Sequence, residues 1–122
     1  MNLILRKAQK EIDGFGVRSL TESDFHRECA KRSIEVVEVK LDACKGLTMW
    51  MLGRVIIVIS VTLKADERLK VMWHEFAHAW LHAPGVSAGA LFCGVNSLLT
   101  KKQEREVDDF VSVALVQEEI DI

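Results

Sequence analysis

The chain has 122 residues, and this length predicts a single domain over residues 1–122. Hydrophobic residues make up 49% of it and charged residues 28%, a composition that excludes disorder or low-complexity structure as the main state. The net charge of -2 argues against direct binding to nucleic acid, because phosphate contacts require a surplus of Lys and Arg.

Neither the N-terminus nor the most hydrophobic segment predicts a membrane-targeting element. The N-terminal apolar run, Leu3–Leu5, is shorter than the roughly 7–15 residues of a secretory signal. The segment Gly46–Leu63 is interrupted by Gly53 and Arg54 and is rich in β-branched residues, which favours buried strands over a membrane helix. Three Cys are too few, and an odd number, for a disulfide-stapled secreted fold. We therefore expect a cytoplasmic protein with reduced thiols and no membrane contact.

The first predicted helix spans Leu20–Ser33. Thr21 and Ser23 are candidate N-caps, and an acidic residue in the first turn suits the helix dipole. The apolar stripe of this helix would consist of Phe25, Cys29 and Ala30. Apolar and acidic residues then alternate with one phase slip over Ile34–Lys40, which predicts a strand with a bulge or a strand at the edge of a sheet.

Two further strands are predicted at Leu47–Leu52 and Arg54–Leu63, joined as a hairpin around Gly53. The second strand contains the continuous β-branched run Val55–Val61. A run without polar alternation indicates that both faces of the strand are covered.

The chain then changes to a helical pattern over Ala65–His82, which Pro84 ends. Apolar residues recur there at intervals of three and four: Leu69, Met72, Trp73, Phe76, Ala77, Trp80 and Leu81. A loop is expected over Val86–Leu99, and Thr100 is the expected N-cap of a last helix that reaches about Glu119. This order predicts an α+β fold with an N-terminal helix, a small three-stranded, mainly antiparallel sheet and two further helices.

The predicted helix contains His74-Glu75-Phe76-Ala77-His78, an HExxH motif. Residues four apart on a helix lie one turn above each other, so the two imidazoles can bind one metal ion. Glu75 lies beside the pair, where it can accept a proton from a water at the metal. The alternative is a helix whose polar face carries this pattern by chance.

A catalytic zinc ion usually has three protein ligands and one open position. The three-histidine pattern HExxHxxGxxH fails here, because Leu81 stands in place of its Gly and Pro84 in place of its third His. The last helix offers acidic side chains instead: Glu104, Glu106, Asp108 and Asp109. Of these, Glu104 and Asp108 share a face, so one can bind the metal while the other orients a ligating His. The alternative is a solvated acidic face.

These motifs together resemble the ImmA/IrrE metallopeptidase family (the DUF955 domain). The resemblance is carried by Arg68-Leu69-Lys70, the HExxH motif, Leu81-His82 and Glu104-x-Glu106-x-Asp108-x-Phe110. It implies a zincin-like minimal core and a zinc metallo-endopeptidase that cleaves a helix-turn-helix transcriptional repressor. It also implies Glu104 as third ligand, with Asp108 as its companion and Glu106 as the fallback. Val107 and Val111 depart from the family, which has small residues there.

The implied reaction uses zinc, with manganese as the alternative metal, to activate water, and Glu75 as general base. The chain has no Tyr to stabilise an oxyanion, so His82 is the candidate, although it can instead cap the end of its helix. The competing hypothesis is a non-catalytic metal-binding module that acts by protein–protein binding in regulation or in a toxin–antitoxin pair. The sequence leaves the oligomeric state open.

Overall fold

Four helices and one three-stranded sheet make up the described part of the chain, which in this computed structural model comprises residues 2–81 and 101–115. In chain order the elements are α1 (Leu3–Glu11), α2 (Glu22–Lys31), β1 (Ile34–Val39), β2 (Gly46–Met51), β3 (Arg54–Ser60), α3 (Ala65–Leu81) and α4 (Lys101–Ala114). The predicted α+β class is confirmed.

Helix α1 was not expected from the sequence. Asn2 caps it, because its side-chain oxygen accepts the backbone N–H of Leu5 at 2.8 Å. Ala8 is the one residue of α1 that is fully buried, while Leu3 at its start is 80% exposed. Leu5 is partly buried beside Ala8, so α1 packs one apolar face against the core although the sequence was interpreted there only as a short apolar run.

The sheet has the strand order β1-β3-β2. Strands β2 and β3 pair antiparallel around Leu52 and Gly53, whose φ angles of 50° and 77° suit a tight hairpin turn. The predicted hairpin and the edge position of β1 are confirmed. However, β1 pairs parallel with β3, so the sheet is mixed where we expected mainly antiparallel pairing. The reason is that β3 inserts between β1 and β2, and local sequence patterns do not specify such non-sequential pairing.

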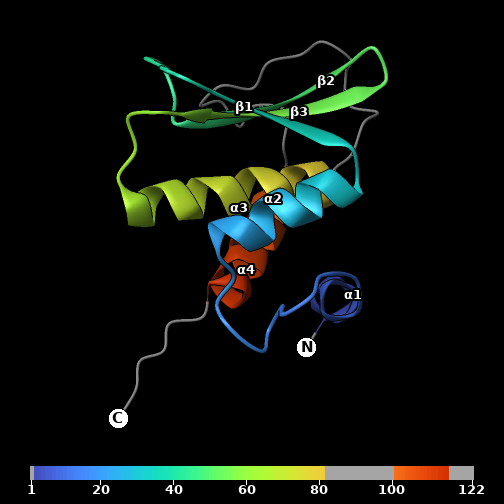
Figure 1. Cartoon of the computed structure of the whole chain (residues 1–122). Helices are drawn as coiled ribbons and strands as arrows, with labels where there is room; N and C mark the ends of the chain where they lie inside the picture. Colours follow the sequence, from blue (N-terminus) through green and yellow to red (C-terminus); the bar gives the residue numbers. More distant parts are fainter. Residues whose placement is uncertain (1, 82–100, 116–122) are drawn as a thin grey trace.

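The elements form layers, with the sheet on one side of α2 and α3 and helix α4 on the other (Figure 1). Trp73 and Phe76 of α3 are fully buried between these layers. Their ring centroids lie 5.1 Å apart, and Trp73 also contacts Phe25 of α2 at 5.9 Å and Phe110 of α4 at 6.5 Å. The apolar stripe predicted for α3 is thus the centre of the core.

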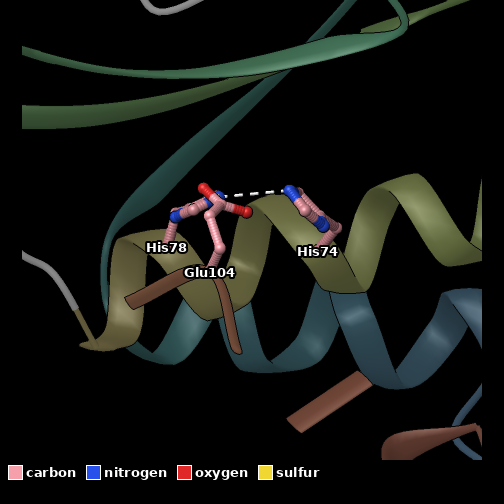
Figure 2. Close-up of side chains that lie close together, drawn as sticks. All are labelled: His74, His78 and Glu104. Atoms are coloured by element: carbon pink, nitrogen blue, oxygen red, sulfur yellow. Dashed lines mark hydrogen bonds and ion pairs between the residues drawn. The ribbon is translucent and has the colours of Figure 1, made fainter. Parts of the chain in front are cut away.

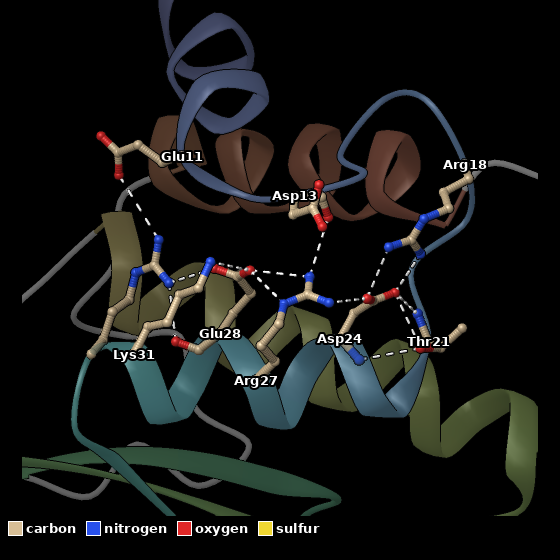
Figure 3. A network of polar contacts seen from close by, with 9 residues as sticks. Glu11, Asp13, Arg18, Thr21, Asp24, Arg27, Glu28 and Lys31 are labelled. Carbon is tan, nitrogen blue, oxygen red and sulfur yellow. Dashed lines mark hydrogen bonds and ion pairs between the residues drawn. The ribbon is translucent and has the colours of Figure 1, made fainter.

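Two buried carboxylates hold α2 in place. Asp24 completes the capping box at the predicted N-cap Thr21 and accepts hydrogen bonds from Arg18 at 2.6 Å and Arg27 at 2.7 Å (Figure 3). Glu28, one turn later, is fully buried and accepts a hydrogen bond from Arg27 at 3.1 Å. Each buried charge is therefore paired, as a low-dielectric interior requires.

Helix α4 ends earlier than expected, at Ala114 rather than near Glu119. The carbonyl of Ala114 accepts the backbone N–H of Leu20 at 2.9 Å, which ties this end of α4 to the segment before α2. The expected loop Val86–Leu99 and the expected N-cap Thr100 lie outside the described residues.

Within residues 2–81 and 101–115, no helix has the length and apolar character needed to cross a membrane. The thiols differ from expectation in one respect. Cys29 is free and buried, but Cys44 is disulfide-bonded, whereas we expected reduced thiols throughout. Spacing along a sequence does not reveal which cysteines the fold brings within bonding distance.

Candidate metal centre

Helix α3 presents the two histidines of the HExxH motif on one face. Their Nε2 atoms lie 3.1 Å apart, and the rings meet edge to face with centroids 4.7 Å apart. The start of α3 is held in place by Arg68, which donates to Glu22 of α2 at 2.7 Å and to Glu38 of β1 at 2.8 Å. The helix that carries the motif is therefore fixed to both of its neighbours.

Helix α4 supplies a third side chain to this pair. Glu104 projects from its first turn toward the histidines (Figure 2), and its Oε2 lies 4.0 Å from Nε2 of His78. One potential ligand atom from each of His74, His78 and Glu104 lies within 4.8 Å of the others. The structure thus brings together the three residues expected to bind the metal.

The other acidic residues of α4 are not in this cluster. The fallback ligand Glu106 is absent from it, and Asp108, the expected companion of the ligands, is exposed. Of the acidic side chains of α4, the cluster contains Glu104, which lies in the first turn of the helix. The expected role of Asp108 in orienting a ligating His stays a prediction.

The three side chains fit a divalent cation. Two nitrogens bound to one tetrahedral zinc at about 2.0–2.1 Å are roughly 3.3–3.4 Å apart, close to the 3.1 Å between His74 and His78. Oε2 of Glu104 is buried and accepts no hydrogen bond from the residues that the structure describes. Leaving a buried acceptor unpaired costs about 1–3 kcal/mol or more when it is charged, and a cation at this position would offset that cost.

Glu75 faces the sheet from the same helix and is only 8% exposed. The hydroxyl of Thr48 on β2 donates to its Oε1 at 2.7 Å and approaches its backbone oxygen at 3.2 Å. Burial raises the pKa of Glu75, and the charge of Glu104 raises it further, while the Thr48 hydrogen bond and His74 act in the opposite direction. A carboxyl group in this environment is suited to exchanging protons with a nearby water.

No pattern in the sequence pointed to Thr48. The signal available was a lone hydroxyl residue within the apolar strand Gly46–Met51, and its buried position on the face toward α3 was visible only in the folded chain. The expected oxyanion stabiliser His82 lies outside the described residues.

Comparison with known proteins adds nothing to this geometry: no family model, no curated protein and no solved structure matches the chain. A function for the protein has to be inferred from its own residues. Those residues are two imidazoles and a carboxylate that converge from α3 and α4, with a buried Glu75 next to the first imidazole.

Proposed function

We propose that this protein is a zinc-dependent metallo-endopeptidase of the ImmA/IrrE type. The observation that carries the proposal is the convergence of His74, His78 and Glu104, with the buried Glu75 directly after His74. Manganese is the alternative metal, because two imidazoles and one carboxylate suit several divalent ions.

The roles of the residues follow from their chemistry. His74 and His78 would bind the metal through Nε2 and Glu104 through a carboxylate oxygen. The bound ion would lower the pKa of a water molecule and polarise the scissile carbonyl group. Glu75 would accept one proton from the water as its oxygen attacks the carbonyl carbon. It would then return the proton to the amide nitrogen as the C–N bond breaks, which yields a carboxylic acid and an amine.

Two features favour catalysis over a structural metal site. The cluster found among the described residues has three donors, the number typical of catalytic zinc, whereas structural zinc sites close with four. A structural site also has no use for an unligated buried carboxylate beside it, such as Glu75. The main alternative is a non-catalytic regulatory or toxin–antitoxin module, which would bind the metal but cleave no peptide.

The substrate class rests on the motif resemblance described above. We propose a protein substrate, a helix-turn-helix transcriptional repressor, cleaved without direct contact of the enzyme with nucleic acid. The net charge of -2 supports the last point, because it provides no surplus of cations for a phosphate backbone.

The test has two stages. Elemental analysis of the purified protein should find about one zinc per chain, lost in His78→Ala and Glu104→Ala but retained in Glu75→Gln. The wild type and Glu75→Gln are then incubated with a proteome-derived peptide library, and the products are identified by mass spectrometry. Cleavage by the wild type alone supports the proposal.

The matched control is Asp109→Asn, an exposed residue on the same helix as Glu104 that should keep both metal and cleavage. Metal retained without cleavage would favour the binding-module alternative. A protein that takes up no zinc even when zinc is added would refute the metal site itself.

A further inference from the structure

We propose that Thr48 is a positioning residue that holds Glu75 in the orientation needed for proton transfer. This inference rests on the proposed peptidase function. Thr48 is 4% exposed, lies on β2 and is paired with Ile57 of the central strand β3. Its backbone is therefore fixed by the sheet while its hydroxyl reaches the helix that carries the HExxH motif.

The hydrogen bond divides the two oxygens of the Glu75 carboxylate into different roles. Oε1 accepts the Thr48 hydroxyl at 2.7 Å, whereas Oε2 accepts no hydrogen bond from any described residue. A glutamate side chain has three rotatable bonds, and an unanchored carboxylate would sample several orientations. Anchoring Oε1 leaves Oε2 as the oxygen available to accept the proton of the attacking water.

The close approach of β2 to α3 brings the Thr48 hydroxyl to the Glu75 carboxylate. Gly46, two residues before Thr48 and on the same face of the strand, has no side chain where β2 approaches α3. A Cβ added to it would lie 2.6 Å from Cγ1 of Val71 and 3.3 Å from Cγ of Glu75. The strand therefore packs against α3 at a distance that only glycine permits, which lets the short threonine hydroxyl reach the carboxylate.

The competing explanation is that the bond merely satisfies a buried hydroxyl, as most buried polar groups require. Both explanations predict some loss of stability when the hydroxyl is removed. They differ in catalysis, because a positioning role affects the chemical step and depends on the presence of the Glu75 carboxylate. A merely structural role would not lower kcat selectively, and its effect would not depend on the Glu75 carboxylate.

The test compares Thr48→Val, which removes the hydroxyl at nearly constant volume, with Thr48→Ser, which keeps it. Both are made in the wild type and in Glu75→Gln, with Thr62→Val as a matched control on an exposed threonine after β3. Each variant is loaded with zinc and assayed with a fluorogenic peptide built from the sequence that the wild type cleaves best in the peptide library.

We expect Thr48→Val to lower kcat about 10- to 100-fold, within the range attributed to ångström-scale misplacement of a reacting group. KM and zinc content should change less than about twofold, and Thr48→Ser should restore most of kcat. In Glu75→Gln, removing the Thr48 hydroxyl should cause no further loss, because the positioned group is already gone.

The outcomes separate this inference from the proposed function. A wild type that binds zinc and cleaves nothing refutes the peptidase function, and the inference falls with it. A wild type that cleaves while Thr48→Val has an unchanged kcat refutes the positioning role alone. If Thr48→Val is too unstable to assay, Thr48→Ser and Thr48→Cys take its place. Ser is a strong hydrogen-bond donor and Cys a weak one, so an equal kcat for these two variants refutes the inference.

Discussion

Asp24 offers a direct test of how the buried carboxylates stabilise this fold. Its side chain accepts hydrogen bonds from Arg18 at 2.6 Å and 3.0 Å, from Arg27 at 2.7 Å and from the backbone N–H of Thr21 at 2.8 Å. The substitution Asp24→Asn keeps the shape and removes the charge. It leaves both guanidinium groups facing a neutral amide that can donate as well as accept.

The expected loss is about 2 kcal/mol of unfolding free energy. Breaking a fully buried ion pair costs about 3–5 kcal/mol, whereas exposed pairs are worth about 0.2–1 kcal/mol. Asp24 is buried, but the side chains of Arg18 and Arg27 are 46% and 36% exposed, so an intermediate value applies. At about 2.1 cal/mol/K of unfolding entropy per residue, this corresponds to a decrease of about 8 °C in Tm.

The effect should also depend on pH. The Arg18 guanidinium is the main group that holds the pKa of Asp24 far below its usual range in the folded protein, against the opposing effect of burial. The unfolded chain binds the proton near pH 3.9, so this stabilisation is complete above about pH 5 and is lost as the pH falls toward the folded pKa. The difference between wild type and Asp24→Asn should therefore shrink by about 1 kcal/mol between pH 5 and pH 3.

Urea unfolding followed by tryptophan fluorescence measures both quantities. Asp42→Asn is the control, since Asp42 is exposed and its replacement should change stability by less than about 0.5 kcal/mol. A difference that stays constant from pH 7 to pH 3 would show that the charge of Asp24 is not the source of its effect.

Three further predictions concern packing and reactivity. Gly46→Ala should lower the urea midpoint by the equivalent of about 1–3 kcal/mol, because the added Cβ would lie 2.6 Å from Val71, and an unchanged midpoint would contradict this close packing. Phe110→Ala should cost about 3–5 kcal/mol, because its ring is fully buried against four aromatic rings, and a calorimetric Tm close to wild type would contradict that role. Burial raises the pKa of the Cys29 thiol to about 12, so at pH 8 iodoacetamide should alkylate it far more slowly in the native protein than in urea; equal rates would contradict its burial.

Several features of this protein follow from local sequence patterns alone. The recurrence of apolar residues every three or four positions predicted α3, and the candidate N-cap Thr21 predicted the start of α2. The Gly53 turn predicted the hairpin of β2 and β3. Each of these signals involves residues within about two helical turns of each other or within one tight turn. The local sequence therefore specifies the element without contacts to distant segments.

Other features were decided by contacts between distant segments. Helix α1 has nine residues, a length that is marginally stable in isolation, so it depends on the packing of Leu5 and Ala8 against the rest of the fold. The parallel pairing of β1 with β3 depends on β3 inserting between two strands that precede it in the chain. The burial of Asp24 becomes favourable only because Arg18 and Arg27 converge on it in the folded chain.

The candidate site divides in the same way. The HExxH motif places His74, Glu75 and His78 by helical periodicity, so these three could be named from the sequence. The sequence offered several carboxylates on the last helix, and the packing of α4 against α3 determined that Glu104 lies beside the histidines. The contact of Thr48 with Glu75 joins residues 27 positions apart, and no local pattern encodes it. Local periodicity thus aligns side chains along one element, whereas only the packing of elements against each other brings α4 and β2 to the motif on α3.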